Sequence, residues 1–143
     1  MHHNLLTGIS KVKERKNIGS GAKWESIVGY SRAVRVGNIV EVAGTTAVED
    51  DQIMFPGDAY QQTQYIMLKI QQALKDAGAK MEHVVRTRIF VTDMDMWEEV
   101  GRAHGEVFRD IRPVSTMVEV YSLIQSGLVV EIEATAIIPE TSA

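Results

Sequence analysis

The chain has 143 residues, a length that suits one domain with a sizeable hydrophobic core. Its formal net charge is −4, and an acidic chain without a basic tract is a poor candidate for binding a nucleic-acid backbone. It has no cysteine and no apolar run of membrane-spanning length, which excludes disulfides, thiolate chemistry, cysteine-ligated zinc and a membrane-spanning helix.

The N-terminal residues 1–22 are expected to form an arm, and residues 23–143 the folded domain. The arm is polar, and Gly19-Ser20-Gly21 separates it from the patterned part of the chain. Because it lacks the apolar segment of a secretory signal, we expect a cytoplasmic protein. The first two strands are predicted at 28–36 and 39–46. The turn signal Gly37-Asn38 between them favours a hairpin.

The first helix is predicted to begin after Asp58, whose side chain can cap it, with Gln61 at the capping-box position. Apolar residues then recur at helical spacing as far as Ala77, and Gly78 ends the helix. A strand is predicted next, at 84–92.

The second helix is predicted to begin at Asp95 as its cap, with Glu98 as the capping-box partner. Arg112-Pro113 stops this helix, because the residue before a proline avoids helical geometry. These capping roles explain the acidic residues without a metal ion. Two further strands are predicted at 114–121 and 129–138, so the element order is ββαβαββ.

Two amphipathic helices can cover only one face of such a sheet, which predicts an α+β fold. Side chains alternate between the faces of a strand. The residues assigned to the helix side are Val85, Thr87, Ile89, Val91, Val118, Val120, Val130, Ile132, Ala134, Ala136 and Ile138. The residues assigned to the opposite face are Arg86, Arg88, Phe90, Ser115, Met117, Glu119, Tyr121, Glu131, Glu133 and Thr135.

The second face mixes large apolar side chains with charges. A core would not tolerate unpaired charges, and a fully solvated face would not need the large apolar residues. A subunit interface that contains a polar cleft fits both observations. The alternative is a solvated antiparallel face with scattered apolar residues.

Seven short motifs occur in order with the spacing of one known family. They are Gly29-Tyr30-Ser31-Arg32-Ala33-Val34, Val36-Gly37-Asn38, Ala43-Gly44-Thr45, Phe55-Pro56-Gly57-Asp58, Phe90-Val91-Thr92-Asp93-Met94, Val118-Glu119-Val120 and Val130-Glu131-Ile132-Glu133-Ala134. From about residue 24 to residue 138 the chain resembles the YjgF/RidA (Rid) family.

The resemblance implies a fold of the bacterial chorismate-mutase type: a mixed sheet with two helices on one face, assembled as a homotrimer around a central β-barrel. Small-molecule clefts would lie between the subunits. The best-known activity of the family is hydrolysis of reactive enamines and imines derived from amino acids, with release of ammonia. The resemblance implies no metal ion and no organic cofactor.

The resemblance also assigns site residues. Tyr30 matches the cleft tyrosine, Gly44 the glycine that donates its backbone amide, and Glu131 the acid that handles water and protons. Ser115 stands where deaminase members have the arginine that binds the substrate carboxylate, and Gly101 replaces a helix asparagine. A serine cannot clamp a carboxylate with two parallel hydrogen bonds. The chain therefore resembles a branch of the family that lacks the arginine.

Other residues have two interpretations each. Glu131 could be a desolvated acid–base group or the partner of Arg88 or Arg86 in an interface ion pair. His104 could be a satisfied core residue, or it could reach a cleft through the space that Gly101 leaves. Tyr30 could line the cleft or pack on its strand.

Arg88 and Arg112 are the candidates to replace the missing arginine, although such arginines are more often surface or pairing residues. Three functions are considered: hydrolysis of a small imine or enamine, binding of a metabolite without turnover, and the endoribonuclease and translation-inhibitor role often given to this family. The negative charge and the lack of a paired histidine set argue against the third.

Overall fold

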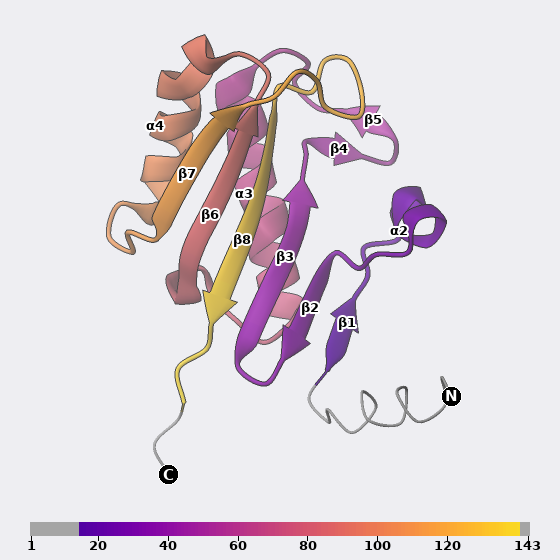
Figure 1. The fold of residues 1–143 in the computed structure, drawn as a ribbon, viewed down its shortest axis with the longest axis vertical. Coiled ribbons are helices and arrows are strands. Elements are labelled where there is room, and N and C mark those ends of the chain that lie inside the picture. The colour runs from indigo at the N-terminus through magenta and orange to yellow at the C-terminus, as the bar shows by residue number, and fades with distance from the viewer. Residues whose placement is uncertain (1–14, 141–143) are drawn as a thin grey trace.

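The computed structural model describes residues 15–140 and contains one six-stranded sheet backed by two long helices (Figure 1). The strand order is β1-β2-β3-β8-β6-β7, and every neighbouring pair is antiparallel except β6 and β7, which are parallel. The strands are β1 (Lys16–Ile18), β2 (Ala33–Val36), β3 (Ile39–Thr45), β6 (Val84–Val91), β7 (Val114–Glu119) and β8 (Val130–Ile137). The mixed α+β fold predicted from the sequence is confirmed.

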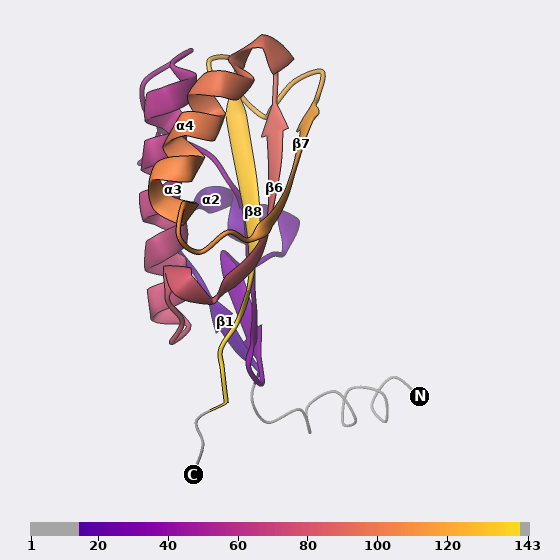
Figure 2. The same ribbon diagram turned by 90° about the vertical axis from the view of Figure 1, so that its left-hand side faces the viewer.

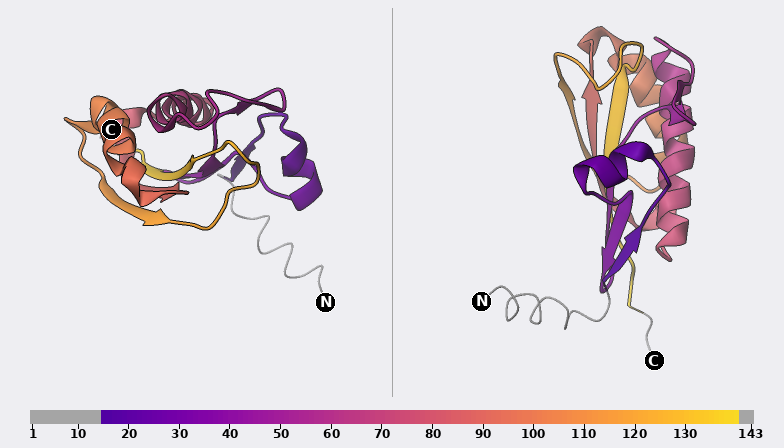
Figure 3. Two further views of the ribbon diagram at one scale, coloured as in Figure 1. Left: turned by 90° about the horizontal axis from the view of Figure 1, so that it is seen from above. Right: turned by 90° about the vertical axis from the view of Figure 1, so that its right-hand side faces the viewer.

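Both long helices, α3 (Ala59–Asp76) and α4 (Trp97–Phe108), lie on one face of the sheet and leave the other face open (Figure 2). A short helix, α2 (Lys23–Val28), lies beyond the β1–β2 edge, whereas α4 and β7 lie at the opposite end (Figure 3). A small hairpin of β4 (Val48–Glu49) and β5 (Gln52–Ile53) extends the chain after β3. The space between α2, β3 and this hairpin is where the larger cleft forms.

The apolar stripe of α3 packs into the core as predicted. Asp58 accepts a hydrogen bond from the Gln61 amide at 2.9 Å, and Gly78 follows the helix with φ 87°, a conformation that glycine adopts without strain. Members of the stripe that are nearly inaccessible to solvent include Ile66, Ile70 and Leu74. The helix boundaries were therefore readable from the sequence.

The start of α4 differs from the prediction. The cap of this segment is Asp93, whose side chain accepts from the Asp95 amide at 2.9 Å and begins a 3₁₀ turn at Met94–Met96. The α-helix then starts at Trp97. Asp95 is not the cap, because the tight turn needs an acceptor two residues earlier.

Strand β8 divides its side chains between the faces as predicted. Val130, Ile132, Ala134 and Ala136 are buried beneath the helices, while Glu131 and Glu133 stand on the open face. In β6, Thr87, Ile89 and Val91 are buried as expected. Val85 is instead 41% exposed, because a register shift between Val84 and Arg86 turns Val84 into the core.

Strand β7 has the opposite orientation to the one predicted. Ser115 pairs with Thr87 and Met117 pairs with Ile89, so both face the helices. Val118, assigned to the helix side, pairs with Phe90 and is 42% exposed on the open face. The sequence of β7 carries apolar residues on both faces, as an edge strand can, and only the parallel register decides between them.

The N-terminal region also differs from expectation. Residues 1–14 of the predicted arm lie outside the described residues. Residues 16–18 form β1 and pair with β2, which places the Ile18 side chain in the core. The strand predicted from residue 28 begins only at Ala33, because α2 occupies residues 23–28 and Gly29, with φ 88°, ends it.

Candidate functional site

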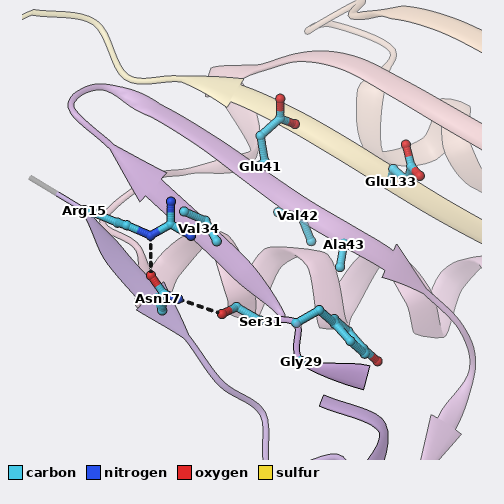
Figure 4. Close-up of a pocket in the computed structure, with 10 residues that line it drawn as sticks. Arg15, Asn17, Gly29, Ser31, Val34, Glu41, Val42, Ala43 and Glu133 are labelled. Carbon is cyan, nitrogen blue, oxygen red and sulfur yellow. Dashed lines mark hydrogen bonds between the residues drawn. The ribbon is translucent and has the colours of Figure 1, made fainter. Parts of the chain in front are cut away.

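Two hollows lie near β2 and β3. The smaller, of about 440 Å³, lies over β1, β2 and β3 and reaches β8. Glu41 and Glu133 stand over it from β3 and β8, and a chain of hydrogen bonds joins Arg15, Asn17 and Ser31 along its rim (Figure 4). This hollow contains none of the sequence-predicted site residues except Tyr30.

The larger hollow, the Glu131 cleft, has a volume of about 610 Å³ and lies between α2, the end of β3 and the β4–β5 hairpin. Its lining includes Tyr30, Arg32, Gly44, Lys69 and Glu131. Three of these, Tyr30, Gly44 and Glu131, are the residues that the family resemblance assigns. The structure therefore brings this part of the predicted site together within one chain.

Glu131 lies against the backbone of Gly44. Strands β3 and β8 pair regularly up to Val42, and a register shift then carries the ladder to Thr45 opposite Ile132. A Cβ atom at position 44 would overlap the Glu131 carboxylate, so the carboxylate occupies space that only glycine leaves free. The bulge and the glycine together position Glu131 in the cleft.

The surroundings of Glu131 shift its pKa upward. Burial raises the pKa of its carboxyl group, the positive charge of Arg32 opposes that rise, and the neighbouring Glu133 adds to it. Within the chain, Arg88 lies 3.5 Å from Glu133, its partner in the ladder, and the alternative of an interface ion pair between Glu131 and Arg88 or Arg86 stays open.

Arg32 is a cation whose charge acts on this carboxylate, and its position in the cleft was not predicted from the sequence. It is 8% exposed and donates through Nη1 to the Gly44 carbonyl at 3.0 Å and to the Thr45 hydroxyl at 2.9 Å. Its Nε lies 3.9 Å from Glu25 of α2. These contacts hold the guanidinium at the wall of the cleft.

Lys69 enters the same cleft from α3. Its Nζ donates to the carbonyls of Thr46 and Val48, and burial together with the charge of Arg32 lowers its pKa to about 8. The negative charge of Glu49 in the hairpin offsets part of this lowering. Glu49 also accepts a hydrogen bond from the Tyr65 hydroxyl at 2.7 Å. Nothing in the local sequence places Lys69 there, because the position depends on where the hairpin packs.

The remaining predicted residues gather elsewhere. His104 Nε2 lies 2.9 Å from the Thr87 hydroxyl, which is 2.8 Å from the Ser115 hydroxyl. Burial lowers the pKa of His104, and its ring packs 4.7 Å from the ring of Phe108. Gly101 is nearby on α4, where an added Cβ would make ordinary contact with Trp97. This group lies on the helix face, and Glu131 lies on the open face.

The two candidate replacement arginines do not line either hollow. Arg88 stands on the open face with Glu133. Arg112 has φ 56° just after α4, and its Nε donates to the Arg109 carbonyl at 2.9 Å, which closes the end of the helix. Within residues 15–140, no three His, Asp or Glu side chains are arranged to hold a metal ion. No helix in this range is long and apolar enough to cross a membrane.

Comparison with known proteins identifies the family. The family model described as Endoribonuclease L-PSP matches residues 21–138. The chain belongs to this family. A solved structure from Mycobacterium tuberculosis, a member of the YjgF/YER057c/UK114 family, is 51% identical, covers 87% of this chain and 99% of its own, and has a TM-score of 0.79. The family predicted from the seven motifs is thus confirmed.

Other relatives agree in length and fold. A Streptomyces coelicolor protein is 38% identical over 85% of this chain and 90% of its own length. A RutC family protein of Pyrococcus abyssi is 30% identical over 75% of this chain and 84% of its own. The YjgF structure of E. coli has a TM-score of 0.70 at 24% identity, covers 88% of this chain and 95% of its own, and shows the shared fold.

Proposed function

We propose that this protein hydrolyses small imine or enamine metabolites in the Glu131 cleft and that it works as a homotrimer. The observation that carries the proposal is the half-buried Glu131 carboxyl, held against Gly44 in a 610 Å³ cleft. Burial raises the pKa of this carboxyl group, and a carboxyl group in a partly desolvated cleft can serve as a proton acceptor and donor.

The chemistry needs only water. Water adds to the carbon of a C=N bond, the nitrogen gains a proton, and the resulting amino alcohol releases ammonia and leaves a carbonyl group. Glu131 would take a proton from the attacking water and return one to the departing nitrogen. The Gly44 amide would bind a polar atom of the substrate, and Tyr30 would form a wall of the cleft. No metal ion or organic cofactor has a step to perform.

Assembly into a trimer would complete the site. Ser115 and His104 lie on the face of the sheet opposite to Glu131, so one chain cannot bring all of them to one ligand. Apolar side chains are exposed on the open face, among them Val114 at 57% and Val118 at 42%. Burying them against other copies is favourable at about 25 cal/mol for each Å² of apolar surface. We therefore place the complete cleft between subunits.

A serine at the arginine position changes the substrates that we expect the site to bind. Ser115 offers one hydroxyl instead of a guanidinium, and its hydrogen bond to Thr87 connects it to His104. Arg32, already in the cleft beside Gly44, is the cation that we assign to an anionic group of the substrate. In this proposal, Arg32, the residue just before β2, would take the role that the arginine on β7 has in deaminase relatives.

The alternative function is metabolite binding without turnover, and an endoribonuclease role is disfavoured. The described histidines, His83 and His104, belong to separate elements and do not form a pair for acid–base cleavage of RNA. The test is ammonia release from imines generated in the assay. Release above the uncatalysed rate supports hydrolysis, whereas saturable ligand binding without release identifies a binding protein. The expectation of a cytoplasmic location remains a prediction.

A further inference from the structure

The position of Lys69 is unusual for a lysine on a helix surface. Its ammonium group does not extend into solvent but reaches the end of β3, where Nζ donates to the Thr46 carbonyl at 2.8 Å and to the Val48 carbonyl at 3.0 Å. The residue is half-buried and lines the Glu131 cleft. By comparison, Lys23 lines the same cleft but is 54% exposed and lies 3.6 Å from Asp51.

The two carbonyls suit a neutral amine. A lysine amine without its third proton has two N–H bonds and one lone pair, and the two carbonyl oxygens can accept both N–H bonds. The lone pair is then left for the cleft. The charged groups around Nζ are Arg32, just before β2, Glu49 from the hairpin and Glu25 from α2. Burial and the charge of Arg32 lower the pKa of Lys69, and the two carboxylates raise it. The first two effects are larger, so the pKa falls from 10.5 to about 8.

We infer that Lys69 is a nucleophile that captures small carbonyl compounds in the Glu131 cleft as a Schiff base. The Nζ lone pair forms a bond to the carbonyl carbon, the carbonyl oxygen gains a proton, and the nitrogen loses one. The carbinolamine hydroxyl then takes a second proton from solvent and leaves as water while the C=N bond forms. The protonated imine keeps one N–H, which can remain on one of the two backbone carbonyls.

The class of carbonyl compound follows from the second cation. Arg32 lies at the wall of the same cleft and provides a partner for a carboxylate, so we assign a small 2-oxo acid to this site. This inference uses the same cleft as the proposed hydrolysis but does not depend on it. Capture needs Lys69 and a carbonyl carbon, whereas hydrolysis needs Glu131, water and a C=N bond.

The test is reductive trapping with glyoxylate, a small 2-oxo acid. The full-length protein is treated with limiting glyoxylate and sodium cyanoborohydride at pH 7.5, and the modified lysines are identified by peptide mass spectrometry. We expect Lys69 to be modified on the order of ten times faster than Lys23, because its lowered pKa leaves a reactive fraction of neutral amine at this pH. Its rate should rise to half its maximum near pH 8. The N-terminal amine is scored separately, since it titrates in the same range.

Two further measurements separate covalent capture from other roles. Lys69→Gln keeps two N–H donors for the carbonyls and should abolish trapping at this position while the protein stays folded. Propanal, an uncharged carbonyl compound of similar size, should be trapped less selectively. Modification of Lys69 at or below the rate of Lys23 would overturn the inference, whatever the ammonia-release assay shows. Conversely, selective trapping without ammonia release would leave the inference standing and contradict the proposed hydrolysis.

Discussion

The carboxylate of Glu131 lies so close to the backbone of Gly44 that a Cβ atom at position 44 would overlap it. The contact joins two strands at the only place where the β3–β8 ladder shifts its register among the residues paired in the described structure. A bulge at this point turns the Gly44 backbone toward the cleft and makes room for the acid. The geometry of the proposed site therefore rests on a glycine and a bulge as much as on the carboxyl group.

Gly44→Ala should displace Glu131 from the cleft. The added methyl group overlaps the carboxylate, so the carboxylate must move, at a cost of about 1–3 kcal/mol in the free energy of unfolding. We expect ammonia release to fall much more than this loss of stability would explain. Urea unfolding and the ammonia assay on the same preparation measure the two effects.

Gly105→Ala is the matched control for that substitution. Gly105 lies within α4, and an added Cβ would meet no atom within 4 Å. Alanine there should raise the free energy of unfolding by about 0.5–1 kcal/mol, because glycine is a poor helix former. Equal losses of activity in both variants would show that Gly44 has no special role.

The open face of the sheet should be an assembly surface. Val118→Asp places a charge beside Phe90 on this face, where another copy would desolvate it. Light scattering should give three times the monomer mass for the wild type and a smaller mass for the variant. Leu68→Asp, on the exposed side of α3, is the control and should leave the mass unchanged. A wild-type protein that is monomeric at micromolar concentration would contradict the trimer.

His104 should make the protein less stable in acid. Burial lowers the pKa of the folded imidazole below its ordinary value of 6.5, so the unfolded chain takes up the proton first as the pH falls. The contribution of His104 is therefore present above pH 6.5 and is lost below it. His104→Gln keeps a hydrogen-bonding group for Thr87 but does not titrate. Urea midpoints at pH 7.5 and pH 5.5 should fall further in the wild type than in the variant, and equal falls would show that His104 is accessible to protons.

Ser115→Arg should restore the charge that deaminase relatives have at this position. If the complete cleft lies between subunits, the guanidinium would bind the carboxylate of an amino-acid-derived imine. Such a contact is worth a few kcal/mol, so kcat/KM for a carboxylate-bearing imine should rise roughly tenfold to a hundredfold. An imine without a carboxylate should show little change. No difference between the two substrates would indicate that Arg32 already supplies the cation.

The sequence predicted the elements that local chemistry determines. The cap at Asp58, the turn at Gly37-Asn38 and the alternation in β8 depend on neighbouring residues only, and each agrees with the structure. The faces of β7 could not be predicted in this way. Which residues of β7 face the helices depends on the parallel register with β6, in which Ser115 pairs with Thr87. A long connection separates the two strands in the sequence.

Only part of the candidate site could be predicted, because the rest depends on long-range packing. Glu131 and Gly44 lie in strands whose pattern and family motifs are clear. Arg32 and Lys69 were not predicted because their positions arise from packing. Arg32 donates a hydrogen bond to the backbone of β3. Lys69 extends from α3 to the backbone at the start of the β4–β5 hairpin. A charged residue beside an apolar helix stripe usually lies in solvent, so no local signal distinguishes Lys69.

The central claim is that Glu131 exchanges protons during hydrolysis, and one comparison of variants tests it most directly. Glu131→Gln and Glu133→Gln each remove one carboxylate from the same face of β8, and both are assayed for ammonia release with light scattering on the same samples. We predict that Glu131→Gln keeps the wild-type mass and loses at least about a hundredfold in rate, whereas Glu133→Gln stays within a few-fold of the wild type. Full activity in Glu131→Gln, or its dissociation into monomers, would contradict this account.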